Sequence, residues 1–257
     1  MTRSPPAAHT IDLNCDVGEA AGQDHLLVPL VSSVNIACGG HAGDTASMRA
    51  TLQLARKHGA AIGGHPGHRD REHFGRRQLP LTGNDAARLV LDQVAHLASL
   101  AEGPLDHVKL HGGLYHQVAH DLTLAHAVCA ALAATWPSLR LVLPCAAPAI
   151  TVALQHGLPV AREAFLDRAY ADDGTLVPRS EPGSVLTEPD EIATRAVRLV
   201  REKRLQARSG RELAIVSDTL CVHGDGPAAV AILKAVRHAL DEAGVHIQPH
   251  RPHRRSS

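Results

Sequence analysis

Five short segments of the sequence combine glycine with residues that can take up protons, carry charge or bind metal ions. Imidazole and carboxylate groups act as general acids and bases, and a lysine ammonium can hold an anion. Glycine beside such groups lets the backbone approach a ligand closely. The segments are Asn14-Cys15-Asp16-Val17-Gly18-Glu19, Cys38 to Asp44, Gly64-His65-Pro66-Gly67, Lys109-Leu110-His111-Gly112-Gly113 and His223-Gly224-Asp225.

Each segment follows a run of residues typical of a β-strand, and amphipathic stretches separate the runs. This alternation indicates parallel strands joined by helices. In a β/α barrel the carboxyl ends of all strands point to one mouth, where active sites are built. The strands expected are Ile11–Cys15, Ser33–Ala37, Ala61–Gly63, His107–Leu110, Arg140–Leu143, Val160–Glu163 and Leu220–His223, with another at Ala214–Val216 or Val245–Ile247. The residues expected to line one pocket are Asp16, His41, His65, Lys109, His111 and His223.

Four stretches place apolar residues at positions i, i+4 and i+7, as on one face of a helix. Thr82 and Thr187 precede two of these helices as capping residues, and Gly59 and Gly244 follow two others. Seven or eight strand–helix units in 257 residues favour a single α/β barrel over an open sheet. The apolar sets are Met48, Leu52 and Ala55; Val90, Val94 and Leu97; Ile192, Ala196 and Leu199; and Ile232, Val236 and Ala239. The expected domain is 11–248, with disordered tails at 1–10 and 249–257.

The composition limits the kinds of partner. Lysine and arginine total 26, as do aspartate and glutamate, so no strong field attracts nucleic acid or an anionic membrane. The five cysteines form no C-x-x-C pair and are odd in number, which predicts free thiols. The N-terminus resembles no signal peptide, and no apolar run is long enough to cross a bilayer. We therefore expect a cytoplasmic protein acting on a small molecule.

Several chemistries are open at the predicted mouth. A divalent metal is possible but is not required by the sequence, because the same groups could hydrogen-bond a substrate and one another. The candidate ligands are Asp12, Asp16, His41 and His65, with His111 and His223 as further histidines that could take part. Cys15, Cys38 and Cys221 lie near the mouth, where a buried structural role is commoner than a nucleophilic one. The sequence has no G-x-S-x-G elbow, phosphate-binding P-loop or dinucleotide fingerprint.

The ordered blocks of these motifs resemble the LamB/YcsF family. The resemblance runs from about Ile11 to Ile247 and rests chiefly on Asn35 to Asp44, together with Ile11 to Asn14, Asp16 and Gly18-Glu19, Ile62 to Asp70, Phe74-Gly75-Arg76, His107 to Tyr115, Arg162-Glu163, Asp167-Arg168 and Tyr170, Asp173 to Gly183, and Cys221 to Asp225. The chain departs from the family pattern at Cys15, Gly40, Gly67 to Arg69, Leu110 and His116, which puts the fine fit of the substrate in question.

The resemblance implies a seven-stranded β/α barrel related to the glycoside hydrolase/deacetylase group. It also implies ATP-dependent opening of 5-oxoproline to glutamate, together with two further subunits, B and C. Because this chain has no recognisable phosphate loop, a partner could carry out the ATP-dependent step.

The charges suggest roles in such a reaction. Asp16 or Glu19 could be the general base on water. Lys109 or Arg179 could bind the substrate carboxylate or a phosphate, and His65 or His111 could donate a proton to the departing nitrogen. The residues expected to bind or orient are Asn14, His41, Asp44, Arg168, Arg179, His223 and Asp225. The two arginines border a predicted loop, Ala171–Gly183, that could close over the site.

Two other functions stay open on sequence grounds. One is a metal-dependent deacetylase or glycan hydrolase on the same barrel, which would need metal but no ATP. The other is a non-catalytic subunit that binds a lactam or sugar.

Overall fold

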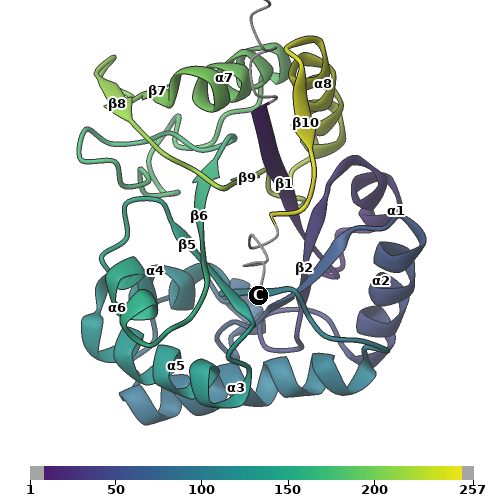
Figure 1. Ribbon diagram of the computed structural model, residues 1–257, viewed down its shortest axis with the longest axis vertical. Helices are drawn as coiled ribbons and strands as arrows, with labels where there is room; N and C mark the ends of the chain where they lie inside the picture. Colours follow the sequence, from purple (N-terminus) through teal and green to yellow (C-terminus); the bar gives the residue numbers. More distant parts are fainter. Residues whose placement is uncertain (1–8, 251–257) are drawn as a thin grey trace, which may run out of the picture.

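Seven parallel strands close into a barrel at the centre of the molecule (Figure 1). The computed structural model describes residues 9–250. Each barrel strand pairs with the next barrel strand along the chain. The seventh, β9, pairs with both β6 and β1, which closes the barrel. The strands are β1 (His9–Val17), β2 (Ser33–Ala37), β3 (Ala61–His65), β4 (His107–Lys109), β5 (Arg140–Pro144), β6 (Val160–Phe165) and β9 (Thr219–Cys221). The expected seven-stranded barrel is therefore confirmed.

The hydrophobic core lies between the strands and the surrounding helices, and the barrel interior is polar. Successive side chains of a strand point to opposite faces. In β1, Leu13 and Cys15 pack in the outer core, whereas Asn14 and Asp16 contact polar groups across the barrel. This alternation places the charged residues of β1 inside the barrel.

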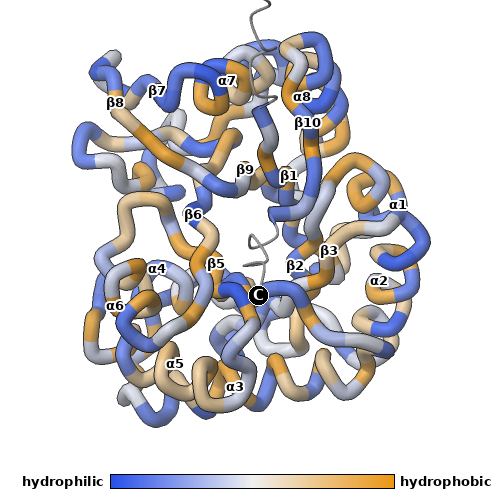
Figure 2. Tube along the Cα trace, in the orientation of Figure 1, coloured by the Kyte–Doolittle hydropathy of each residue, from blue (hydrophilic) through white to orange (hydrophobic). Residues whose placement is uncertain are grey.

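The helices form a ring around the strands in Figure 1. The four predicted apolar faces are buried apart from Ala239, which is half-buried against the same core. Figure 2 shows hydrophobic and hydrophilic stretches alternating along helices such as α2 and α7. The helices are α1 (Asp24–Leu27), α2 (Thr45–Lys57), α3 (Gly83–Leu100), α4 (Gly112–His120), α5 (Leu122–Thr135), α6 (Ala149–Gln155), α7 (Pro189–Glu202) and α8 (Ala229–Glu242), with 3-10 turns η1 (Val28–Leu30) and η2 (Arg71–His73).

Helix ends follow most of the sequence signals. Thr82 caps α3, where its side chain accepts a hydrogen bond from the backbone of Asp85. Gly59 and Gly244 take left-handed backbone angles just after α2 and α8, as expected of glycines that end helices. The capping prediction at Thr187 is wrong, because α7 begins two residues later, at Pro189. Proline suits that first turn since its missing N–H would have no helical partner there.

Three short strands lie outside the closed barrel. β7 (Arg204–Gln206) and β8 (Glu212–Ala214) form an antiparallel hairpin that the sequence did not predict as a pair. β10 (Val245–Ile247) pairs in parallel with His9–Ile11 of β1. Both segments predicted as an additional strand thus correspond to strands of the structure, β8 and β10, although β8 lies at 212–214 instead of 214–216.

The expected tails are only partly covered by the described residues. β1 begins at His9, inside the range assigned to the first tail, and Pro249 and His250 are half-buried. Residues 1–8 and 251–257 lie outside the described part of the chain. Within 9–250 no single helix is long and apolar enough to cross a membrane; only α4 and α5 together reach that length and composition, across a bend of 104°.

Candidate active site

A cavity of about 680 Å³ opens at the carboxyl ends of the strands. Five residues predicted to converge there line it together: Asp16, His65, Lys109, His111 and His223. The sixth, His41, is buried and stacks its ring on that of His111, with 3.6 Å between ring centroids. The shared direction of the parallel strands thus brings distant motifs into one site, as the sequence predicts.

Lys109 lies at the centre of the charged groups. Its Nζ is 2.9 Å from Oδ1 of Asp16 and 2.9 Å from Oε1 of Glu163, and its side chain is 2% exposed. Burial alone would lower the pKa of Lys109, but the nearby carboxylates of Asp16 and Glu163 outweigh it and hold the pKa well above its ordinary value. Lys109 is therefore a fixed cation shared by two carboxylates.

The amide side chain of Asn35, in the barrel interior, orients Asp16. Nδ2 of Asn35 donates to Oδ1 of Asp16 and to Oδ1 of Asn14, both at 2.8 Å. Burial opposes the charge of Asp16, but His65 and Lys109 outweigh burial and hold its pKa well below the ordinary value. Its second oxygen, Oδ2, lies 3.4 Å from Nε2 of His65. Asp16 is thus ionised and rigidly oriented at the cavity floor.

The interior of the barrel needs one glycine for this arrangement. A side chain at Gly63 of β3 would place its Cβ 2.2 Å from the imidazole of His107. His107 lies there because its Nε2 donates to Oδ1 of Asn35 at 2.8 Å. Gly63 therefore makes room for the ring that orients Asn35 beneath the site.

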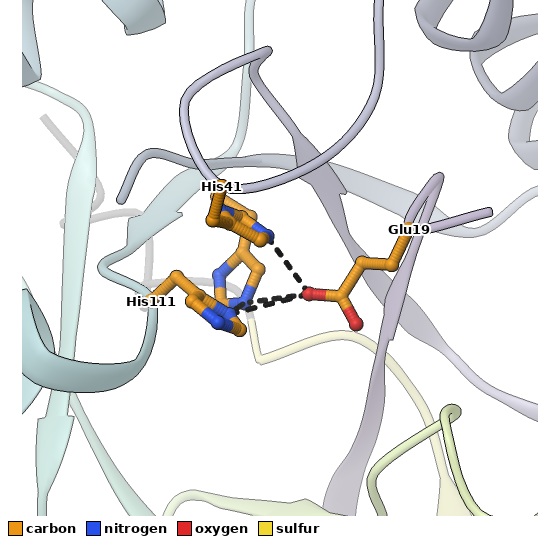
Figure 3. A group of neighbouring side chains, drawn as sticks. Glu19, His41 and His111 are labelled. Atoms are coloured by element: carbon orange, nitrogen blue, oxygen red, sulfur yellow. Dashed lines mark hydrogen bonds and ion pairs between the residues drawn. The ribbon is translucent and has the colours of Figure 1, made fainter. Parts of the chain in front are cut away.

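Beside Asp16 lies a group that we call the imidazole cluster: Glu19, His41, His65 and His111 (Figure 3). Oε1 of Glu19 is 2.9 Å from Nε2 of His41 and 3.2 Å from Nδ1 of His111. Burial opposes the charge of Glu19, yet its contacts with His111 and His41 outweigh burial and hold its pKa well below the ordinary value. Burial also lowers the pKa of His41 to about 3, so this ring is neutral.

Another imidazole–carboxylate pair is formed by His223, which lines the cavity, and Asp167. Nδ1 of His223 is 2.9 Å from Oδ2 of Asp167, and the His223 ring stacks on Phe165. The backbone N–H of His223 also donates to Asp167. Burial would raise the pKa of Asp167, but His223 lowers it below the ordinary value. The bond through Nδ1 orients Nε2 of His223 away from the carboxylate.

Two arginines line the outer cavity, next to the loop that precedes α7. Arg168 is buried and donates to the carbonyl oxygens of Ser184 and Val177, which fixes the loop. Arg179 comes from the loop itself and also lines the cavity. Burial lowers the pKa of Arg168 to about 10, with the charge of Arg179 adding to the effect. The two guanidiniums make this wall of the cavity cationic.

Three predicted site residues lie elsewhere. Asp12 lies at the opposite end of β1, where it accepts hydrogen bonds from Ser32, Ser33 and Thr219, so it cannot share a metal with the histidines. Asp44 is exposed and caps α2 through the backbone N–H of Ser47, because a carboxylate before a helix satisfies its free N–H groups.

Asp225 lies at the rim and pairs with Arg76, so it does not orient the groups at the cavity floor. Asn14 remains close to the site, below the cavity: its Nδ2 donates to Oε1 of Glu163 at 3.0 Å. The cysteines near the mouth are free and buried, and burial raises the pKa of Cys38 to about 12. This agrees with the structural role favoured from the sequence.

Sequence reasoning gave no role to three residues of the site. Glu163 ends a predicted strand but has no glycine beside it, so it lacked the signal used for the other motifs. Tyr115 donates to Oε2 of Glu163 at 2.7 Å, and Asp167 pairs with His223. A search for carboxylates at the carboxyl ends of the predicted strands, with or without glycine beside them, would have identified Glu163.

Fold and site together define a parallel β/α-barrel protein with buried carboxylates, imidazoles and a lysine at the mouth of the barrel. The sequence profile of the LamB/YcsF family matches residues 11–255. The chain belongs to the LamB/YcsF family.

Named relatives cover almost the whole chain. A protein of Symbiobacterium thermophilum, named as the A subunit of 5-oxoprolinase, is 45% identical over 245 residues, covering 92% of this chain and 94% of the relative. A protein of the same name from Thermus thermophilus is 44% identical over 246 residues, covering 93% and 98%.

Solved structures agree with the fold. The lactam utilization protein from Thermus thermophilus superimposes with a TM-score of 0.88 at 42% identity, covering 93% of this chain and 99% of that one. The peptidoglycan deacetylase PdaC from Bacillus subtilis reaches a TM-score of 0.51 at 12% identity, covering 95% and 89%. The second likeness concerns the fold alone: it shows that the two chains share a barrel architecture.

Proposed function

We propose that this chain is the A subunit of a 5-oxoprolinase, which opens the lactam ring of 5-oxoproline to give glutamate. The observation that carries the proposal is the fixed Asp16–Lys109–Glu163 group on the floor of a cavity, in a chain whose relatives with that name are 44–45% identical over nearly its full length. Such a site can supply both an oriented base and a polarising cation for addition of water to an amide.

Asp16 is suited to act as the general base that activates water. Its Oδ1 is occupied by Lys109 and Asn35, while within residues 9–250 Oδ2 has no contact with a donor shorter than the 3.4 Å to Nε2 of His65. A water held by Oδ2 would attack the ring carbonyl carbon and pass a proton to Asp16 as the C–O bond forms. Lys109 keeps Asp16 ionised and ready for this step.

His223 is better suited than His65 or His111 to act as the general acid that protonates the departing nitrogen. Both of those rings have one nitrogen bound to a backbone carbonyl and the other directed into the imidazole cluster. His223 is held by Asp167 through Nδ1, and no hydrogen bond within the described residues occupies its Nε2. As the C–N bond of the ring breaks, Nε2 would give a proton to the departing nitrogen; this step uses the doubly protonated ring, because Nδ1 keeps its own proton in the bond to Asp167.

The cationic outer wall suits the carboxylate of 5-oxoproline. Arginine binds carboxylates through paired N–H groups, and Arg168 and Arg179 both line the cavity. Lys109 is less suited to this role than the sequence suggested, because two carboxylates already neutralise it. We assign carboxylate binding to Arg179, which the loop places in the cavity wall.

The reaction is proposed to be coupled to ATP through the B and C subunits. An unstrained lactam resists hydrolysis because amide resonance weakens its carbonyl as an electrophile. Transfer of a phosphoryl group from ATP to the amide oxygen would remove that protection. Addition of one water would then open the ring to an acyl phosphate, and a second water would release phosphate and glutamate. This chain has no phosphate loop, so we assign the transfer to a partner and the hydrolysis to the present chain. The cytoplasm suits a protein with five free thiols that depends on ATP.

The test is release of glutamate from 5-oxoproline and ATP, measured for this chain alone and with purified B and C subunits. Glutamate formation only when all three are present supports the proposal. Binding of 5-oxoproline with no glutamate under any combination would instead indicate a non-catalytic binding protein.

One observation favours a second candidate, a metal-dependent deacetylase. The imidazole cluster brings three histidines and a carboxylate together beside the cavity. A deacetylase would release acetate from N-acetylated glycans without ATP and would lose activity to chelators. The same chain can be assayed for both reactions, so the two functions are directly separable.

A further inference from the structure

The tautomers of two histidines in the imidazole cluster are fixed by the backbone. Nδ1 of His65 lies 2.8 Å from the carbonyl oxygen of Lys109, and Nε2 of His111 lies 2.8 Å from the carbonyl oxygen of Phe74. A carbonyl oxygen only accepts hydrogen bonds, so both nitrogens carry protons. As metal ligands both rings would be neutral, and the remaining nitrogens would then be the lone-pair donors: Nε2 of His65 and Nδ1 of His111.

These two lone pairs face each other. Nε2 of His65 and Nδ1 of His111 are only 2.9 Å apart, and Oε1 of Glu19 lies 3.7 Å from the first and 3.2 Å from the second. Three electron-rich atoms at this spacing repel one another unless something positive lies between them. The occupant is either a shared proton or a metal ion.

The spacing fits a metal ion. Zinc lies about 2.0–2.2 Å from nitrogen and oxygen ligands, so two tetrahedral ligands are about 3.3–3.5 Å apart. The distances from Glu19, 3.2 and 3.7 Å, lie on either side of that range, and the 2.9 Å separation of the two nitrogens would widen by about 0.4 Å around an ion. The rings of His65 and His111 are almost perpendicular, at 89°, which allows their lone pairs to converge.

His41 does not fit as a fourth ligand. Its ring is parallel to that of His111, with 3° between the planes and 3.6 Å between the centroids. An ion in the plane of one ring lies several ångströms from the plane of the other, whereas imidazole donates its lone pair in plane. His41 instead donates from Nε2 to Glu19, at 2.9 Å, and orients that carboxylate.

The surroundings also suit a cation. A ligand histidine commonly donates its other N–H to a backbone carbonyl, as both His65 and His111 do. Both rings line the cavity, which provides an entry path and space for a further ligand. The nearby ammonium of Lys109 is neutralised by Asp16 and Glu163, so it does not oppose a second cation.

We infer that His65, His111 and Glu19 form a binding site for a divalent first-row transition metal, with His41 positioning Glu19. Two imidazoles and one carboxylate with an open coordination position are a donor set used for zinc and for iron(II). The inference concerns the proposed active cavity but does not depend on the reaction assigned to it. Metal binding is measured without substrate, so failure of either proposal leaves the other testable.

The experiment uses untagged full-length chain, freed of metal with a chelator and titrated with Zn²⁺ by calorimetry. We expect about one equivalent to bind tightly, and Co²⁺ in its place to give the visible absorption of a low-coordinate nitrogen–oxygen site. His111→Ala and Glu19→Gln each remove a ligand and should weaken Zn²⁺ binding more than about 100-fold. His41→Phe keeps the ring stack but loses the bond to Glu19, so we expect a loss of only about 10–100-fold.

The control is the exposed pair of His126 and His156, whose facing ring nitrogens are 3.1 Å apart and could hold metal adventitiously. His126→Ala should leave the tight equivalent unchanged. Circular dichroism and thermal melting of each variant confirm that it folds. Absence of a tight equivalent in the wild-type chain, or its loss in His126→Ala alone, overturns the inference and leaves a shared proton between His65 and His111.

Discussion

The two ends of the barrel both bury an aspartate of β1, but only one end presents it to a cavity. Asp12 and Asp16 lie four residues apart on one strand, and each is 5% exposed. Asp12 accepts three hydroxyl hydrogen bonds at 2.6 Å from residues of β2, β9 and the turn before β2. Asp16 pairs with Lys109, and its other oxygen has no short hydrogen bond to any residue that the structure describes.

The space at the two ends differs as much as the hydrogen bonding. The cavity beside Asp12 measures about 10 Å³, about the volume that holds one water, whereas that beside Asp16 measures about 680 Å³. A buried carboxylate is costly at either end unless it has partners. Burial of a charge is thus no mark of function by itself; incomplete hydrogen bonding next to a cavity is the better indicator.

The largest expected effect is that of Lys109→Met. The substitution leaves the carboxylates of Asp16 and Glu163 buried without their cation, and breaking a buried ion pair in this way costs about 3–5 kcal/mol of the free energy of unfolding. Denaturation by urea measures the loss, and glutamate release should disappear. Lys234→Met, on the exposed side of α8, is the matched control and should change stability by less than about 0.5 kcal/mol. An unchanged midpoint for Lys109→Met would show that the pairs do not form.

Paired substitution of the two aspartates tests the comparison directly. Asp16→Asn keeps the shape but removes the proton acceptor, and should lower glutamate formation by the complete complex by roughly 10²–10⁴-fold. Asp12→Asn should leave turnover near the wild-type value, because its partners are structural. Equal losses in both variants would mean that the two ends do not differ in function.

A smaller effect is expected at Asp44, which the sequence placed in the site and the structure places at the start of α2. Asp44→Ala removes the cap on the backbone N–H of Ser47 and should cost about 1 kcal/mol of unfolding free energy. Glutamate formation should not change. A loss of turnover with unchanged stability would return Asp44 to the site.

The smallest expected effect is a slope with pH. Burial raises the pKa of Asp12 in spite of hydrogen bonds from Ser32, Ser33 and Thr219. Its contribution to stability is therefore complete below the ordinary value of about 3.9 and is lost as pH rises through the folded pKa. Relative to Asp12→Asn, the wild type should lose unfolding free energy as pH rises above about 4. A difference that does not vary with pH would show that Asp12 titrates normally.

Much of the barrel could be predicted from the sequence because strand–helix alternation has few solutions once the strands are parallel. The carboxyl ends of five strands converge as expected, and this alone brings Asp16, His65, Lys109 and His111 together. Two-residue periodicity cannot separate Asp12 from Asp16, since both point into the barrel. Only the neighbours of each aspartate, contributed by other strands, decide which one reaches the cavity.

Other features depend on contacts that no local pattern encodes. Asp44 precedes a helix, so its sequence context fits a cap and a site residue equally well. The stacking of His41 on His111 arises between loops far apart in the chain and decides which histidines can share an ion. The β7–β8 hairpin has three residues in each strand, too few for a clear alternation.

The closure of the barrel ties the beginning of the chain to its end. β1 pairs with β9 at residues 219–221 and with β10 at residues 245–247. During synthesis one edge of β1 therefore stays unpaired until nearly the entire chain has left the ribosome. Contacts so distant in sequence slow folding, and an open strand edge invites pairing with other chains. Chains that end before β9 should for this reason aggregate, although most of their residues could already form strand–helix units.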